Sequence, residues 1–565
     1  MWNSLASKLA NSQLRLLGKL LGVWLCVCSA SSFAADLYVS PRGSDSNPGT
    51  TVASAWRTLQ KAADNAVAGD TVWVAGGLYS EKLTLSRSGT SAKYIAFRNN
   101  PGEIPTIDGI GSRVGQYDAL VLLTNVAYVR IEGLTIRNSP FWGLYIGGES
   151  HHLQLTNLDI YDSKASGIMI DGPHERPAFT VLNKNKIHHN TQGGITLWIS
   201  KGGYYRIEEN EVFANSGGGN YDGVQIGGGN GATHHIIVKN NIIHDNGKAD
   251  KGEDNLDLGG HGISHHYLVE GNTIFGGAGS FKLHSGSMKD HTYSPGKSGF
   301  HIARHNNFTR IGFVSYGFPN PIVLYHNTFV DAGQAFMIYN EDDGQNKNSG
   351  DSSYLGGDAG RMNIKNNIFW QEEASTSHIA LAAGPGSIDI SERSINFRNN
   401  LFKRAEGQKL EWPGLLPEIG KVSLIRRLFG SKSIGQTEVA NLQSTSNAVE
   451  MFRNYHNRDY RLVAESPAID AGSFLTKAIT AGNKAIILKA DRASYFQDGY
   501  CVDNECLGNP DQIYVQGSGL VLITKIDDAK NEITLAEPKS WSIGAGISLP
   551  FAGKAPDLGE FEFRR

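Results

Sequence analysis

The 565-residue chain has only four cysteines, few long apolar runs and no excess of charge of either sign. Its formal net charge is −3 and 19% of its residues are charged, which gives no indication of a nucleic acid or an anionic membrane as partner. The 67 glycines and 18 prolines follow no G-X-Y period, which excludes a collagen-like chain. Glycine and asparagine instead separate short apolar segments, as is typical of short strands joined by tight turns.

The start of the chain carries a predicted targeting signal. Basic residues precede an apolar run from Leu20 to Cys28, and Ser32-Phe33-Ala34 offers a small-x-small cleavage site. This run is shorter than the roughly 20 residues that a membrane-spanning helix needs. We therefore expect residues 1–34 to be a signal peptide, and the mature protein to be a secreted or periplasmic monomer without a membrane or nucleic-acid partner.

The four cysteines divide into two pairs. Cys26 and Cys28 leave with the signal, and the bulky residues before them disfavour a lipoprotein. Cys501 and Cys506 remain as a close pair, which an oxidising compartment favours closing into a disulfide. Zinc is the alternative for this pair, but no second cysteine or histidine pair follows at ligand spacing.

From about Val129 a short motif recurs: a polar residue, usually asparagine, then any residue, then a large apolar residue. The spacing of the apolar positions ranges from 21 residues (Phe308 to Phe329) to 39 residues (Phe329 to Ile368), which fits a fixed coil plus loops of differing length. The copies are Asn185-Lys-Ile187, Asn210-Glu-Val212, Asn240-Asn-Ile242, Asn272-Thr-Ile274, Asn306-Asn-Phe308, Asn327-Thr-Phe329, Asn366-Asn-Ile368 and Asn399-Asn-Leu401, preceded by Leu134-Thr-Ile136 and Leu158-Asp-Ile160.

A second short strand recurs within each coil. The copies are Gly143-Leu-Tyr-Ile146, Gly167-Ile-Met-Ile170, Gly194-Ile-Thr-Leu197, Gly223-Val-Gln-Ile226, Asn255-Leu-Asp-Leu258 and Ser280-Phe-Lys-Leu283. The four-strand blades of a propeller and the strict leucine pattern of a leucine-rich repeat are both missing. The pattern therefore predicts an all-β solenoid, a parallel β-helix, in which the asparagine column forms an internal amide ladder.

The ends of the chain depart from the repeat. Residues 36–128 read as an N-terminal cap and first coils, with a short amphipathic helix at Thr58 to Val67 that covers the open end. We expect the β-helix with the site over 129–402, an insertion and last coil over 403–472, and a small β subdomain with a terminal strand over 473–565. We interpret the C-terminal β segments as insertions that are not part of the repeating coils.

The candidate catalytic and metal-binding residues lie between Tyr221 and Gly286. In the second strand of each coil, the residue between the last two apolar side chains points outward. This column reads Tyr145, Met169, Thr196, Gln225, Asp257 and Lys282. Asp222 and Asp254 stand three residues earlier in their copies, again in register, and Glu253 adjoins them. Stacked carboxylates repel, and Ca²⁺ is the cation that such oxygen ligands favour; the alternative is a solvated acidic edge.

Lys282 is the candidate catalytic base. A surface lysine is the commonest fate of this residue type, but Lys282 stacks beside the proposed metal site on a face otherwise made of Tyr, Met, Thr and Gln. A neighbouring Ca²⁺ would lower its pKa and prepare it as a base. The matching reaction is β-elimination of a uronate polysaccharide, in which a cation makes the proton next to a carboxylate more acidic.

Asp222-Gly, an acidic pair with a third acid three residues on, and Phe-Lys282-Leu on the next coil resemble the family-nine polysaccharide lyases, which include pectate lyases. The resemblance implies a right-handed parallel β-helix, with Ca²⁺ held by Asp222, Glu253, Asp254 and Asp257 and Lys282 as the base. Glu253 stands where the family has Asp. The implied substrate is an acidic polysaccharide, either pectate-like or an exopolysaccharide or sheath polymer.

Other readings stay open. Arg310 is a candidate for binding a substrate carboxylate, His284 and Tyr316 for protonating the leaving oxygen, and Trp142, Trp198 and Trp370 for stacking on sugars. The run Asp171-Gly-Pro-His174-Glu175, which we expect in a loop, loosely resembles the Asp-Pro-His motif of alginate epimerases. The alternatives are therefore a uronan C5-epimerase-like enzyme or a non-catalytic carbohydrate-binding β-helix. A glycoside hydrolase would need two separated carboxylates without a lysine.

Overall fold

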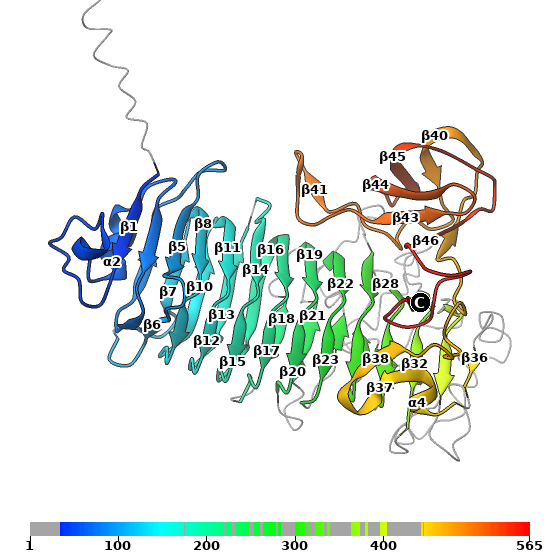
Figure 1. Cartoon of the computed structure of the whole chain (residues 1–565), viewed down its shortest axis with the longest axis horizontal. Helices are drawn as coiled ribbons and strands as arrows, with labels where there is room; N and C mark the ends of the chain where they lie inside the picture. Colours follow the sequence, from blue (N-terminus) through cyan, green and yellow to red (C-terminus); the bar gives the residue numbers. More distant parts are fainter. Residues whose placement is uncertain are drawn as a thin grey trace, which may run out of the picture.

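The protein is a parallel β-helix, seen here in a computed structural model (Figure 1). The structure describes residues 34–112, 114–174, 176–217, 221–227, 233–247, 253–259, 264–277, 281–283, 300–311, 313–316, 322–332, 336–339, 363–372, 379–381, 396–403, 442–444 and 446–564. The coils stack along one long axis, and each coil contributes one strand to each of three faces, named here sheets A, B and C. The predicted all-β parallel solenoid is confirmed.

The three sheets consist of short parallel strands. Sheet A contains β1 (Asp36–Val39), β2 (Thr71–Val74), β5 (Ile95–Asn99), β8 (Ala127–Glu132), β11 (His151–Thr156), β14 (Thr180–Asn183), β16 (Ile195–Glu208), β19 (Thr233–Lys239), β22 (Ser264–Glu270), β25 (His301–Arg304), β28 (Ile322–Tyr325), β31 (Asn363–Lys365) and β34 (Asn396–Arg398). Sheet B contains β3 (Gly77–Tyr79), β6 (Pro105–Asp108), β9 (Thr135–Arg137), β12 (Asp159–Tyr161), β15 (Lys186–His188), β17 (Glu211–Phe213), β20 (Ile242–His244), β23 (Thr273–Phe275), β26 (Asn307–Thr309), β29 (Thr328–Val330), β32 (Ile368–Trp370), β35 (Leu401–Lys403) and β36 (Leu442–Gln443). Sheet C contains β4 (Leu83–Leu85), β7 (Ala119–Thr124), β10 (Trp142–Gly147), β13 (Ile168–Pro173), the first part of β16, β18 (Val224–Ile226), β21 (Leu256–Leu258), β24 (Phe281–Leu283), β27 (Phe313–Tyr316), β30 (Phe336–Tyr339) and β33 (Ile379–Leu381).

The core is built of identical positions from successive coils. Alternate residues of each strand point inward, so Ile187, Val212, Ile243 and Ile274 stack in register on sheet B. In later coils this column becomes phenylalanine, and the rings stack with centroids 4.6 to 5.0 Å apart; they are Phe308, Phe329, Phe369 and Phe402. Burial of this continuous apolar column is the main favourable term that holds the coils together.

A buried asparagine ladder runs along the turns between sheets A and B, as the sequence predicts. Asn185 donates its side-chain amide to Leu155 O and to Asn210 Oδ1, at 3.0 and 2.9 Å, and the pattern repeats from coil to coil. The ladder consists of Asn185, Asn210, Asn241, Asn272, Asn306, Asn327, Asn367 and Asn400. Each member satisfies turn backbone groups that would otherwise be buried without partners.

In three copies the sequence pattern selects the wrong asparagine. Asn240, Asn366 and Asn399 are not ladder members; they adopt left-handed backbone conformations, with φ of 54°, 56° and 52°. The ladder residue is the next one in each case. Asparagine tolerates the left-handed region better than most residues, so in these three Asn-Asn pairs the first Asn makes the bend and the second enters the ladder.

The N-terminal end is closed as predicted. Helix α2 (Leu59–Asn65) buries Leu59, Ala62 and Ala63, and the Thr58 hydroxyl accepts a hydrogen bond from Lys61 N at 3.2 Å. The short 3₁₀ helix η1 (Val52–Ser54) precedes it. The helix packs beside β1 and β4, where it covers the first coil and its unpaired edge.

The C-terminal part forms a separate six-stranded sheet that packs on the outer face of sheet A (Figure 1). Its strands are β39 (Thr476–Lys477), β40 (Gly482–Lys489), β43 (Gln512–Val515), β44 (Gly519–Asp527), β45 (Glu532–Trp541) and β46 (Gly546–Ser548). A buried ion pair joins the two units: Arg304 Nη2 lies 2.7 Å from Asp511 Oδ1 and 2.6 Å from Glu270 Oε2. Cys501 and Cys506 form a disulfide between β41 (Cys501–Val502) and β42 (Glu505–Cys506).

The segments around Asp470 and Asp557 do pair with each other, but they do not close the solenoid. Leu558 N donates to Ala468 O at 2.9 Å, and Gly559 N donates to Asn366 O at 2.9 Å, so the pair lies along the turns between sheets A and B. The expected terminal strand is not found in residues 549–564, which contain no strand. Before them, α4 (Ala448–Met451), β37 (Phe452–Asn454), η6 (Tyr455–Asn457) and β38 (Asp459–Leu462) pack against Trp370.

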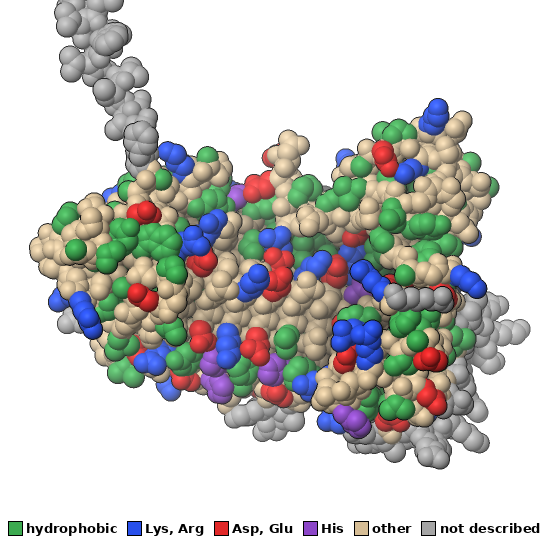
Figure 2. All heavy atoms as spheres, in the orientation of Figure 1, with side chains coloured by type: hydrophobic (Ala, Val, Ile, Leu, Met, Phe, Trp, Pro, Cys, Tyr) green, Lys and Arg blue, Asp and Glu red, His purple; other side chains and the backbone are tan. Residues whose placement is uncertain are grey.

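Within the described residues, neither helix has the length or the apolar composition needed to cross a membrane. Charged side chains of both signs lie interspersed on the visible face of the solenoid (Figure 2). Arg98 with Glu132 and Lys239 with Glu270 are ion pairs between adjacent coils. This mixing agrees with the small net charge of the chain.

We predict that Asn241→Ala destabilises the fold by about 1–3 kcal/mol, because Asn210 N, Asn210 Nδ2 and Ile207 O each lose a buried partner. Urea unfolding followed by circular dichroism measures the change. The matched control is Asn240→Gly at the exposed left-handed position next to it, which should change stability by less than about 0.5 kcal/mol. A larger loss in the control than in Asn241→Ala would contradict the ladder assignment.

Candidate functional site

The outer face of sheet C carries the predicted column of side chains in register. Tyr145 pairs with Met169, Met169 with Thr196, and Thr196 with Gln225 on successive strands. Gln225 then pairs with Asp257, and Asp257 with Lys282. Adjacent positions are one strand spacing apart, roughly 4.8 Å. The structure therefore brings Asp257 and Lys282 together as neighbours on adjacent coils.

A second asparagine ladder, which the sequence reading missed, positions the acidic segment. It runs along the turns between sheets B and C through Asn190, Asn215, Asn246 and Asn255. Asn246 Nδ2 donates to Asn255 Oδ1 at 3.1 Å, and Asn255 Nδ2 donates to Gly276 O at 2.7 Å. Asn255 immediately follows Asp254, so the ladder fixes the backbone from which the carboxylates project. The signal available in the sequence was an asparagine five residues after three successive positions of the first ladder: Asn190 after Asn185, Asn215 after Asn210, and Asn246 after Asn241.

Three carboxylates meet at the start of β18 and β21. Asp222, Asp254 and Asp257 each offer an oxygen, and these oxygens all lie within 4.8 Å of one another. Asp222 and Asp254 are buried, Asp257 is half-buried, and Asp254 N donates to Asp222 Oδ1 at 2.7 Å. Burial, together with the nearby Asp257 and Asp254, raises the pKa of Asp222 well above its ordinary value.

This donor set fits a divalent cation. Carboxylate oxygens are the hard ligands that Ca²⁺ takes, and a cation between the three groups would remove the repulsion that raises the pKa of Asp222. Glu253, the fourth predicted ligand, is buried beside Asp254 but is not one of the three residues whose oxygens meet. Its role as a ligand stays a prediction.

Lys282 completes the cluster. Its ammonium group forms an ion pair with Asp254 Oδ2 and lies 3.9 Å from Asp257 Oδ2. Burial alone would lower the pKa of Lys282, but the carboxylates of Asp254 and Asp257 outweigh burial and raise it above its ordinary value. Without a cation Lys282 is therefore an ammonium ion, and the lowered pKa expected beside bound Ca²⁺ stays a prediction.

The remaining candidate residues from the sequence differ in how far their side chains are exposed. Arg310 is exposed on the turn after β26, one coil beyond Lys282. Trp142 and Trp370 are buried, with 8% and 1% of their surface exposed, whereas Trp198 is 41% exposed. His284 lies outside the described residues, as does the side chain of Tyr316.

The run that resembles an epimerase motif is predicted to lie in a loop, but this prediction is wrong for Asp171 to Pro173. Asp171 to Pro173 form the end of β13, because they continue the pairing with β16. His174 is buried against the ring of Tyr205, with ring centroids 5.9 Å apart, and burial lowers its pKa. This histidine therefore does not join the acidic cluster, and Glu175 lies outside the described residues.

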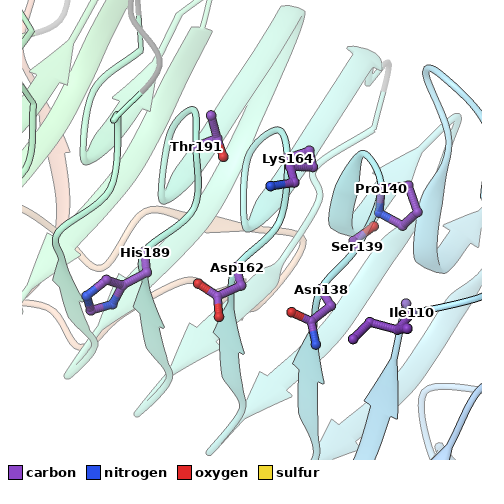
Figure 3. A pocket seen from close by; sticks show the side chains of 9 residues that line it. Ile110, Asn138, Ser139, Pro140, Asp162, Lys164, His189 and Thr191 are labelled. Atoms are coloured by element: carbon purple, nitrogen blue, oxygen red, sulfur yellow. The ribbon is translucent and has the colours of Figure 1, made fainter.

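A hollow of about 600 Å³ lies over the turns that follow β9, β12 and β15. Asn138, Asp162 and His189 form one row at the ends of these strands, and Lys164 and Thr191 lie across from them (Figure 3). The turns belong to the same column that carries Asp222 and Asp254, but they come from earlier coils. The hollow is therefore separate from the carboxylate cluster.

Comparison with known proteins gives two family matches. The model described as "Right handed beta helix region" matches residues 119–402, and the one described as "Pel9A-like, right handed beta helix region" matches residues 37–195. The first of these matches spans half of the chain and contains every residue of the cluster.

Individual relatives are distant. The chain is 36% identical over 138 residues to the uncharacterized protein YwoF of Bacillus subtilis, covering 23% of this chain and 29% of that one. It is 27% identical over 225 residues to pectate lyase PEL9 of Emericella nidulans, covering 33% of this chain and 54% of the relative. Against pectate lyase L of Paenibacillus polymyxa it is 23% identical over 378 residues, covering 63% and 76%. The matches thus span about a third and about half the length of the first two relatives.

Among solved structures, the crystal structure of pectate lyase Pel9A aligns with a TM-score of 0.45 and 14% identity, covering 79% of this chain and 94% of that one.

We predict that Asp222→Asn stabilises the metal-free protein at neutral pH. The folded state raises the pKa of this carboxyl, so it binds the proton more tightly than the unfolded chain, and wild-type stability falls as pH rises through the folded pKa. A tenfold difference in proton affinity corresponds to about 1.4 kcal/mol. The amide keeps the acceptor for Asp254 N and removes the titration. Urea unfolding in chelated buffer should show a stability difference that shrinks as pH falls; a difference independent of pH would contradict the buried charge.

Proposed function

Because the chain belongs to the right-handed β-helix family, we propose that it is a Ca²⁺-dependent polysaccharide lyase that cleaves a uronate-containing polymer by β-elimination. The observation that carries the proposal is the cluster of Asp222, Asp254, Asp257 and Lys282 on one outward face. The similarity to two pectate lyases supports the reaction class. We further propose that the chain is related to the family-nine lyases through these residues.

The proposed role of Lys282 is to remove the proton next to the substrate carboxylate. The electron pair of that C–H bond forms a carbon–carbon double bond, the bond to the glycosidic oxygen breaks, and that oxygen takes a proton from water. Asp222, Asp254 and Asp257 would hold the cation, which would supply positive charge beside the substrate carboxylate and make this proton more acidic. Lys282 acts from an adjacent coil, so the base and the metal ligands face the same sugar.

The ion pair between Lys282 and Asp254 joins the proposed base to a proposed metal ligand. A lysine held by carboxylates cannot accept a proton, so the base must be released before it can act. The carboxylates that raise the pKa of Lys282 are the same groups that would hold the cation. Cation binding and activation of the base are therefore coupled through Asp254 and Asp257.

We predict that Lys282→Ala lowers kcat by at least about 10²–10⁴-fold, the range typical of a lost general base. The assay incubates the protein with a panel of uronate polymers and follows the ultraviolet absorbance of unsaturated chain ends. The matched control is Lys239→Ala, which removes a lysine paired with Glu270 on sheet A and should leave the rate unchanged. Full activity of Lys282→Ala would show that Lys282 is not the catalytic base. Failure of wild type to give unsaturated ends from every polymer would refute the lyase proposal.

We predict that Ca²⁺ raises the unfolding midpoint of the wild type, by an amount equivalent to about 2.7 kcal/mol when free Ca²⁺ is a hundredfold above its Kd. Asp254→Asn and Asp257→Asn should abolish this shift and the activity, while Mg²⁺ should not replace Ca²⁺ because it demands a stricter octahedral shell. Glu253→Gln tests the fourth ligand: a weakened Ca²⁺ response assigns it to the site. An equal midpoint with Ca²⁺ and with chelator would contradict the metal proposal.

A further inference from the structure

Trp198 is a large apolar side chain exposed on the face that carries the carboxylate cluster. It lies on β16, two residues after Thr196, so both side chains point outward from sheet C. Of its indole surface 41% is exposed, although Leu197 and Ile199 on either side of it are fully buried. The strand is thus well packed, and the exposure of Trp198 is a property of its outward position.

Among the described residues, the positions next to Trp198 on the side of the cluster carry no side chain. Toward the N-terminus, Trp198 pairs with Asp171 of β13. Toward the cluster, the next two positions of the same column are glycines: Gly227 N donates to Leu197 O at 3.0 Å, and Gly259 N donates to Ile226 O at 2.8 Å. Neither glycine carries a side chain, so the column between Trp198 and the coil of Asp257 is a floor of backbone.

This floor runs directly beside the proposed reaction centre. The strand with Trp198 is two coils from the strand with Asp257, roughly 10 Å at the usual strand spacing, and the glycine column is two residues across from the column of Gln225 and Asp257. A chain of sugars that follows the solenoid axis over Asp257 and Lys282 would therefore pass next to the indole. Asp171, which accepts a hydrogen bond from Tyr145 Oη at 3.4 Å, offers a carboxylate at the same level for sugar hydroxyls.

We propose that Trp198, with the floor at Gly227 and Gly259, is a sugar-stacking subsite that holds one pyranose ring of the polymer about two coils from the cleaved bond. The inference rests on the proposed function, because it takes the same polysaccharide as ligand. The apolar face of a pyranose ring packs on an aromatic face, and polar groups beside it fix its orientation. A side chain at either glycine would stand where the ring lies.

The kinetic test compares Trp198→Ala with Trp198→Phe on the polymer that wild type cleaves best and on its shortest cleavable oligosaccharide. Trp198→Ala should raise KM for the long polymer about tenfold, which corresponds to about 1.4 kcal/mol, with kcat unchanged and no effect on the short substrate. Trp198→Phe keeps an aromatic face and should restore most of the affinity. Trp73→Ala, a tryptophan on the outer face of sheet A, is the control and should behave as wild type. Equal KM values for Trp198→Ala and wild type would overturn the subsite.

A binding test separates this inference from the lyase proposal. Affinity electrophoresis in gels that contain each uronate polymer compares Lys282→Ala with the double variant Lys282→Ala/Trp198→Ala, and it needs no turnover. Retardation of the first and not of the second supports the subsite, even if wild type yields no unsaturated ends and the lyase proposal fails. Equal retardation of both variants, or retardation of neither by any polymer, would overturn the subsite.

Discussion

Parallel pairing in strict register between coils is the constraint on which the rest of this molecule depends. Because paired residues on adjacent coils lie one strand spacing apart, each position of a coil stacks on the same position of the next coil. Stacking favours like residues where they satisfy one another, as the buried asparagines and the phenylalanine column do. It is unfavourable for like charges. Asp222 and Asp254 stand at the same position of adjacent coils, and burial together with the nearby Asp257 and Asp254 raises the pKa of Asp222.

The same constraint explains which parts of the fold and the site can be predicted from the sequence. The outward column from Tyr145 to Lys282 is correct at each position because alternation fixes which side chains point out, and an apolar pair brackets each outward residue. The motif predicts Asn240 in place of Asn241 as the ladder residue because Asn-Asn-Ile-Ile matches it in two frames. Only the left-handed turn at Asn240, a property of the folded bend, distinguishes them. The pairing of the segments at Asp470 and Asp557 against Asn366 depends on long-range packing that no local pattern carries.

The site adds a competition that a list of residues does not reveal. The sequence places three aspartates and a lysine together, and it predicts that a bound cation would lower the pKa of the lysine. In the structure the proposed base contacts two of the proposed metal ligands, since Lys282 pairs with Asp254 and approaches Asp257. The ammonium ion of Lys282 partly neutralises the carboxylates, as a cation would.

The three faces of the solenoid differ in what covers them. This difference indicates which face is accessible to a bound polymer. The outer residues of sheet A, among them Tyr204, Ile237 and Leu268, are buried under the C-terminal sheet. The outer face of sheet B carries a ladder of stacked rings whose faces are already occupied by one another, namely Tyr161, His188, Phe213, His244 and Phe275. Sheet C, in the described coils, offers an exposed indole, glycine backbone and the carboxylate cluster on one side. A long polysaccharide bound at Lys282, as proposed, would therefore lie along sheet C and pass Trp198 on the same face.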